Sequence, residues 1–114
     1  TLKWKGLKRG PTKRHCHGMW AGNGKLYVYG GRMIEPDVSN LEFASHTIAD
    51  FVAFDLETKS WSSVKVTGAQ PFDISEFTVL PLFHGKDKDD GEPSSVIVWG
   101  GYTELDQSKG RMTE

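Results

Sequence analysis

Two short segments of the sequence end in the same way. Lys25–Gly31 and Ser95–Gly101 each contain a run of aliphatic and aromatic residues that is closed by a pair of glycines. Such runs favour extended strands, and glycines permit turns that other residues adopt only with strain. The two glycine pairs lie 70 residues apart, and Trp4 and Trp61 lie 57 residues apart. A long repeat with uneven spacing predicts supersecondary units that stack on one another.

The first repeat has a definite order of residues. A proline, an arginine and a histidine precede the apolar run, and an aspartate strand and a tryptophan follow the glycine pair. This order resembles the kelch repeat, which forms a four-stranded blade of a β-propeller. The residues that carry the resemblance are Pro11, Arg14, His17, Leu26, Gly30, Gly31, Asp50, Phe54, Asp55 and Trp61, with Gly100 and Gly101 in the second repeat. That repeat has Ile74 and Phe77 where the first has Arg14 and His17.

The resemblance implies an all-β fold of antiparallel four-stranded blades, with about two blades present and incomplete. We expect residues 1–9 to be the last strand of a preceding blade, 10–67 to be a complete blade, and 68–114 to be the first half of the next. Strands are expected at Leu2–Leu7, His15–Ala21, Lys25–Gly30, Ile48–Asp55, Ser60–Thr67, Glu76–Phe83 and Ser95–Gly100. Trp4 and Trp61 suit packing between blades because of their large apolar area.

Turns and insertions separate these strands. Asn23-Gly24 is a strong signal for a two-residue hairpin, and Leu56–Lys59 is a second turn. We expect Arg32–Thr47 and His84–Ser94 to be polar loops that lie at opposite ends of the blades. The chain begins at Thr1 rather than Met, so we expect it to be part of a longer protein. Because repeat units bury their cores only against neighbours, we also expect the isolated chain to aggregate or to pack loosely at its open blade edges.

Composition narrows the functional classes. Hydrophobic residues make up 37% of the chain, and its longest apolar runs have four residues, which is too short to span a bilayer. The single cysteine excludes an internal disulfide and favours an intracellular, cytoplasmic location. Residues 1–34 contain eight Lys and Arg and no acid, which could attract nucleic acid. Because Trp4 is assigned to packing, we do not expect nucleic acid as the partner.

The most conspicuous chemical cluster is His15-Cys16-His17. On a strand the two imidazoles would share one face and the thiol the other, whereas zinc sites in proteins use three or four ligands. His17 is also accounted for by the repeat pattern. We therefore expect no metal, no cofactor and no catalytic residue in this chain.

The resemblance implies a non-catalytic scaffold or adaptor that binds another protein, because most kelch propellers have that role. The residues that we expect to contact the partner are Arg14, His17, Arg32, Met33 and Ile34, since Met33 and Ile34 are apolar within an otherwise polar segment. The alternative is part of a metal-dependent propeller enzyme, oxidase- or lyase-like, whose site lies in other blades.

Overall fold

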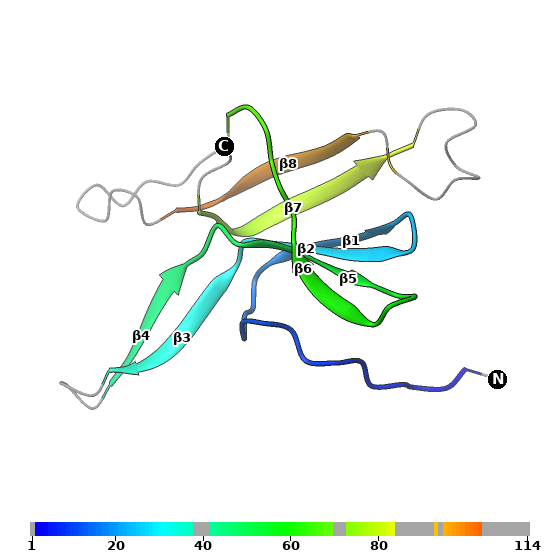
Figure 1. Ribbon diagram of the computed structural model, residues 1–114. Helices are drawn as coiled ribbons and strands as arrows, with labels where there is room; N and C mark the ends of the chain where they lie inside the picture. The colour runs from blue at the N-terminus through cyan, green and yellow to red at the C-terminus, as the bar shows by residue number, and fades with distance from the viewer. Residues whose placement is uncertain (1, 38–41, 70–72, 84–92, 94, 104–114) are drawn as a thin grey trace.

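The computed structural model describes residues 2–37, 42–69, 73–83, 93 and 95–103. Its regular structure is antiparallel β-sheet throughout these residues (Figure 1), which confirms the predicted all-β fold. The strands are β1 (Gly18–Gly22), β2 (Lys25–Tyr29), β3 (Arg32–Asp37), β4 (Glu42–Thr47), β5 (Phe51–Asp55), β6 (Ser60–Ser63), β7 (Ser75–Leu82) and β8 (Ser95–Tyr102).

Four of the strands form one sheet in the order β1-β2-β5-β6, which we call the first blade. The hairpin between β1 and β2 turns at Asn23 and Gly24, whose φ angles are 50° and 69°, as expected for a primed turn. The turn between β5 and β6 is closed by the side chain of Asp55. Its Oδ1 accepts the backbone N–H of Thr58 at 3.1 Å and of Glu57 at 2.8 Å, and these bonds lower the pKa of the carboxyl group.

The first blade buries apolar side chains on both faces. On one face, the ring of Phe51 packs edge-on against Tyr29 and Trp20, with centroids 5.6 and 5.5 Å away. On the other face, Phe54 is 1% exposed and lies 5.2 Å from the ring of Trp61. Burial on both faces is what a sheet between two neighbouring layers requires.

β7 and β8 form a two-stranded sheet, the half-blade, that repeats the geometry of β1 and β2. Gly18 pairs with Tyr29 in the first blade, and Thr78 pairs with Trp99 in the half-blade. The backbone angles also repeat, because Cys16 and Glu76 have φ angles of 56° and 58°. Likewise φ is 65° and 101° at Gly30 and Gly31, and 74° and 102° at Gly100 and Gly101. The internal repeat predicted from the sequence is therefore a structural repeat.

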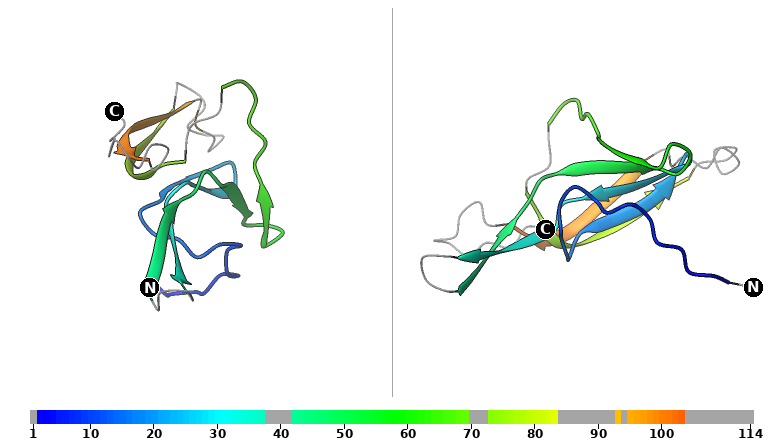
Figure 2. Two further views of the ribbon diagram at one scale, coloured as in Figure 1. Left: turned by 90° about the vertical axis from the view of Figure 1, so that its left-hand side faces the viewer. Right: turned by 60° about the horizontal axis from the view of Figure 1, so that its bottom comes forward.

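The half-blade lies against the first blade as a separate layer, with β7 beside β1 (Figures 1 and 2). Two backbone hydrogen bonds join the layers: the N–H of Glu76 donates to the oxygen of Cys16 at 3.0 Å, and the N–H of Gly31 to that of Ile74 at 2.7 Å. Between them, the ring of Phe77 occupies the space that a side chain at Gly18 would need. A Cβ atom on Gly18 would stand 2.5 Å from Cε2 of Phe77.

The strand expected at Leu2–Leu7 does not form, and residues 2–10 have no regular structure. Leu2 and Trp4 are fully exposed, at 102% and 104%, so the packing role expected of Trp4 is not realised in this chain. An extended segment becomes a strand only when a neighbour satisfies its backbone groups, and no described strand pairs with this one. Whether residues 1–9 belong to a preceding blade stays a prediction.

The segment Arg32–Thr47 is not the polar loop that we expected. It forms a hairpin of β3 and β4, with Arg32 paired to Thr47 and Asp37 to Glu42. The hairpin is closed at its base, where the N–H of Ile48 donates to the oxygen of Gly31 at 3.0 Å. The polar composition of this segment suggested a loop, whereas backbone pairing between its two halves makes it a hairpin. The other expected insertion, His84–Ser94, lies outside the described residues except for Pro93.

The remaining strands differ from expectation at their ends. β1 starts at Gly18 rather than His15, because the left-handed backbone of Cys16 interrupts the extended conformation. β6 ends at Ser63 rather than Thr67, because its partner β5 begins at Phe51 and the last pair is Val52 with Ser63. β5 itself starts three residues later than predicted, after Asp50.

Replacing Gly18 by alanine should loosen the contact between the two layers. The added methyl group would overlap the side chains of Phe77 and Val79, and overpacking of this kind costs about 1–3 kcal/mol of stability. Urea denaturation followed by tryptophan fluorescence measures the loss. Gly6→Ala is the control, because a Cβ at Gly6 meets nothing within 4 Å. Equal denaturation midpoints for the two variants would contradict the packing described.

Candidate functional site

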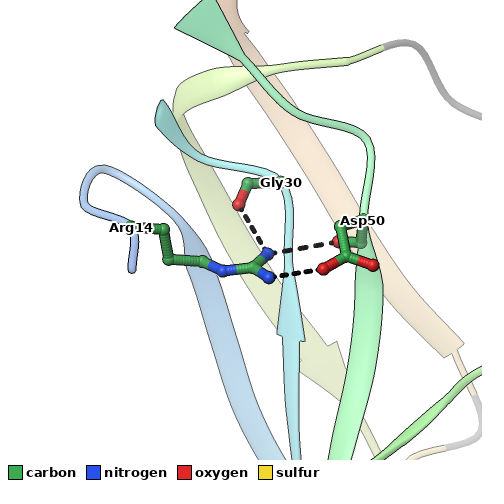
Figure 3. Close-up of polar contacts among 3 residues, drawn as sticks. All are labelled: Arg14, Gly30 and Asp50. Carbon is green, nitrogen blue, oxygen red and sulfur yellow. Dashed lines mark hydrogen bonds and ion pairs between the residues drawn. The ribbon is translucent and has the colours of Figure 1, made fainter. Parts of the chain in front are cut away.

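The side chain of Arg14 joins three segments of the first blade (Figure 3). Its Nη1 donates to the backbone oxygen of Gly30 at 3.0 Å and to that of Asp50 at 3.4 Å. Its Nη2 forms an ion pair with Oδ2 of Asp50 at 2.6 Å. The Arg14 side chain is 5% exposed, whereas that of Asp50 is 38% exposed. This Arg14 clasp therefore links the chain before β1, the end of β2 and the start of β5.

His17 follows the clasp and is half-buried. Its Nδ1 is buried and has no hydrogen-bond partner among the described residues. Burial lowers the pKa of the imidazole, and the charges of Arg14 and His15 lower it further. The environment thus favours neutral His17. Cys16, which precedes it in the sequence, is exposed, and no group of three or more metal-capable side chains occurs in the described part of the chain.

The base of the β3–β4 hairpin carries the other three residues predicted to contact a partner. The guanidinium carbon of Arg32 lies 5.1 Å from the centroid of the Tyr102 ring, a cation–π contact to the half-blade. The backbone of Arg32 also exchanges two hydrogen bonds with His15, at 2.8 and 3.0 Å. Met33 is half-buried, and Ile34 is 53% exposed. Side chains alternate along a strand, so Arg32 and Ile34 lie on one face of β3 and Met33 lies on the other. Arg14 lies in the interior.

Asp73 is a second polar junction, and the sequence analysis missed it. Its Oδ2 accepts the hydroxyl of Thr47 at 2.7 Å, and its Oδ1 accepts that of Thr103 at 3.3 Å. The carboxylate thereby links β4 to the segment after β8. Together with burial, its charge raises the pKa of Tyr29. The available signal was an acid in the second repeat where the first has Lys13, but the two threonines are too distant in sequence to point to it.

The structure places several of the residues predicted to be structural in specific contacts. Gly30 and Gly31 adopt left-handed angles where neighbouring backbone approaches: a Cβ atom at Gly30 would stand 2.6 Å from the oxygen of Ile74. Trp61 packs on Phe54, and its Nε1 donates to the backbone oxygen of Lys8 at 3.1 Å. Pro11 is exposed.

Comparison with known families agrees with this geometry. Residues 13–68 match the family model of the kelch motif. The chain belongs to the kelch-repeat family. The matched segment contains the Arg14 clasp, the whole first blade and the inserted hairpin, so the hairpin is an elaboration within a kelch repeat. A search of curated proteins gave no match. In the described part of this kelch protein, no helix has the length and apolarity needed to cross a membrane.

Neutralising Asp50 should weaken the first blade. In Asp50→Asn, the buried Arg14 guanidinium loses its charged partner, and hydrogen bonds to charged groups are worth about 1.5–3 kcal/mol. We expect the lower part of this range because Asp50 is 38% exposed. Glu57→Gln, which removes an exposed acid from the turn after β5, is the control and should leave the denaturation midpoint unchanged. An Asp50→Asn variant as stable as the parent would refute the structural role of the clasp.

His17 should make stability depend on pH. Its pKa in the folded state is lower than the ordinary value of 6.5, so the unfolded state binds more protons in this range. The contribution of neutral His17 to the free energy of unfolding is therefore fully present above about pH 6.5, and it decreases as the pH falls below that value. His17→Phe, which introduces the residue found at the equivalent position 77, should flatten this dependence. Thermal melts between pH 5 and 8 test this, and parallel profiles for the two proteins would contradict it.

Proposed function

We propose that this kelch protein is a non-catalytic scaffold or adaptor, and that it binds another protein through the base of its inserted hairpin. The hairpin base consists of Arg32, Met33, Ile34, His46 and Thr47. In Figure 1 the hairpin of β3 and β4 extends away from the two blade sheets, on the side opposite the β1–β2 and β5–β6 turns. Kelch motifs commonly serve protein interactions, which supports the general class of function.

The observation that carries the proposal is that the projecting hairpin is braced on both strands. β3 is held by Arg32 on the Tyr102 ring, and β4 by the bond from Thr47 to Asp73. A two-stranded hairpin alone is marginally stable, so these contacts maintain its orientation. A rigid projection loses little conformational entropy on binding, which favours recognition.

Exposed apolar area supplies the binding energy in this proposal. Ile34 is 53% exposed on β3. Full burial of an exposed isoleucine contributes about 1.5–3 kcal/mol, so covering the exposed half of Ile34 contributes roughly half of that. Arginine, here Arg32, is also enriched at binding hot spots. Arg14 and His17 are less accessible than Ile34, and their contact with a partner stays a prediction. A cytoplasmic location is part of the proposal, and the exposed thiol of Cys16 fits a reducing compartment.

Site-specific photo-crosslinking tests this proposal. A benzophenone amino acid at position 34 should crosslink one partner protein in cells, whereas the same group at Leu56 should not. The two positions are matched, since Ile34 is 53% and Leu56 is 47% exposed, but Leu56 lies in the turn at the other end of the blade. Ile34→Asp should then weaken binding of that partner at least about tenfold, roughly 1.4 kcal/mol, and Leu56→Asp should not. Equal crosslinking at both positions would reject the hairpin as the binding site.

A further inference from the structure

A small cavity lies beside the Arg14 clasp, between the start of β5 and the segment that follows β6. Its volume is about 190 Å³, and its lining includes Tyr29, Asp50, Phe51, Ser63, Val64 and Val66. Sites for drug-sized ligands usually measure about 300–1,000 Å³. The cavity is therefore of a size for a small group, such as one side chain or a simple amine, rather than for a nucleotide or a large cofactor.

Backbone hydrogen bonds hold both walls of this cavity. On one side, the N–H of Gly30 donates to the oxygen of Asp50 at 3.0 Å. On the other side, the N–H of Val64 donates to the oxygen of Phe51 at 2.9 Å, which fixes the segment after β6 against β5. The cavity is thus preformed, and a preformed site avoids the cost of ordering its walls when a ligand binds.

The carboxylate of Asp50 has one oxygen that the blade does not use. Its Oδ2 is paired with Arg14 at 2.6 Å, whereas no described residue donates a hydrogen bond to Oδ1. In Figure 3 this second oxygen is directed away from Arg14. The Asp50 side chain is 38% exposed, so a ligand can reach it. An ionised acceptor forms its strongest hydrogen bonds with a cationic donor.

The donor set of the cavity distinguishes between classes of cation. Calcium takes about six to eight oxygen ligands, whereas Asp50 supplies the one carboxylate among the described residues that line the cavity. A guanidinium pairs best with both oxygens of a carboxylate, and Arg14 already occupies Oδ2. An ammonium is a point charge that needs only one of these oxygens. Its remaining N–H groups can donate to the hydroxyl of Ser63 and to water.

The rest of the lining suits an alkyl chain. Val64 is half-buried and Val66 is 36% exposed, so both present apolar surface that a ligand can cover. The rings of Tyr29 and Phe51 form the aromatic part of the lining, with centroids 5.6 Å apart, and aromatic faces attract cations. Lysine side chains combine these requirements, because their methylene stems lie along apolar surface while the charged head reaches a polar group.

We propose that this cavity binds a primary alkylammonium group, such as the side chain of a lysine. The ammonium donates to Oδ1 of Asp50, and the alkyl chain lies against Val64 and Val66. The guanidinium of Arg14 opposes the incoming charge from a greater distance than the carboxylate attracts it, so binding is favourable but weak. The cavity is separate from the hairpin base, and the proposal does not depend on the function proposed for the hairpin.

An NMR titration of the isotopically labelled full chain with n-butylammonium chloride tests the site. The backbone amide signals of Asp50, Phe51 and Val64 should shift in a saturable way at millimolar concentrations, and added salt should weaken the effect. n-Butanol is the matched control probe, because it has the same chain length and no charge. Equal shifts with n-butanol, or no saturable shift of these signals with n-butylammonium, would overturn the proposal.

A second probe distinguishes the two sources of an alkylammonium group. Nα-acetyl-lysine N-methylamide carries the same chain on a peptide backbone. If it binds as well as n-butylammonium, the cavity accepts a lysine of a polypeptide. If n-butylammonium alone binds, the cavity accepts a free amine and excludes the backbone attached to a lysine. Failure of both probes to bind would overturn the proposal.

Two variants test the contacts. Asp50→Asn should abolish binding of n-butylammonium, and Glu57→Gln, which removes an exposed acid at the other end of β5, should leave it unchanged. Because Asp50→Asn also weakens the blade, Val66→Lys provides a test that keeps the clasp. Its introduced ammonium should occupy the cavity and weaken binding of the probe at least about tenfold, whereas the uncharged Val66→Gln should not. Binding that survives Val66→Lys would overturn the proposal.

Discussion

The packing of Phe77 against two glycines is the contact on which the arrangement of this kelch protein depends. Gly18 and Gly30 lack side chains where the Phe77 ring enters. A Cβ atom on Gly18 would overlap Phe77 and Val79, and one on Gly30 would overlap the backbone oxygen of Ile74 and crowd the Phe77 ring. Two backbone hydrogen bonds, from Glu76 to Cys16 and from Gly31 to Ile74, lie beside this contact. Apolar packing and backbone pairing therefore act at the same seam, and the seam fixes how one layer follows the next.

The first blade is held by a different interaction, the Arg14 clasp. One guanidinium donates hydrogen bonds to the backbone oxygen of Gly30 and to the backbone oxygen and carboxylate of Asp50. The left-handed turn after β2 and the start of β5 therefore keep their relative positions. The second repeat has Ile74 in place of Arg14, and there burial to 8% exposure replaces the ion pair. A hairpin inserted between β2 and β5 can then project without disturbing the blade, with Asp73 and the Arg32–Tyr102 contact as its supports.

The strands and the repeat could be predicted because they depend on local patterns: apolar runs, Asn23-Gly24 and the glycine pairs each specify their own conformation. The hairpin of β3 and β4 could not, since its polar composition resembles a loop and its formation depends on pairing and on bracing by Tyr102 and Asp73. Arg14 was expected at a binding surface, whereas its side chain is buried by its contact with Asp50. Because Asp50 is 36 residues away, no local sequence pattern indicates that Arg14 is buried. The strand expected at Leu2–Leu7 depends on a neighbour that no described residue supplies.

The most direct test of the account is a nuclear Overhauser experiment on the isotopically labelled chain, recorded on the aromatic ring protons of Phe77. The structure predicts cross-peaks from this ring to the α-protons of Gly18 and to the ring of Tyr29, whose centroid lies 5.7 Å away. These contacts join residues of the two layers and arise only if β7 stacks on β1 as described. A Phe77 ring whose cross-peaks are confined to β7 and β8 would contradict the stacking, and with it the account of the chain as successive kelch blades.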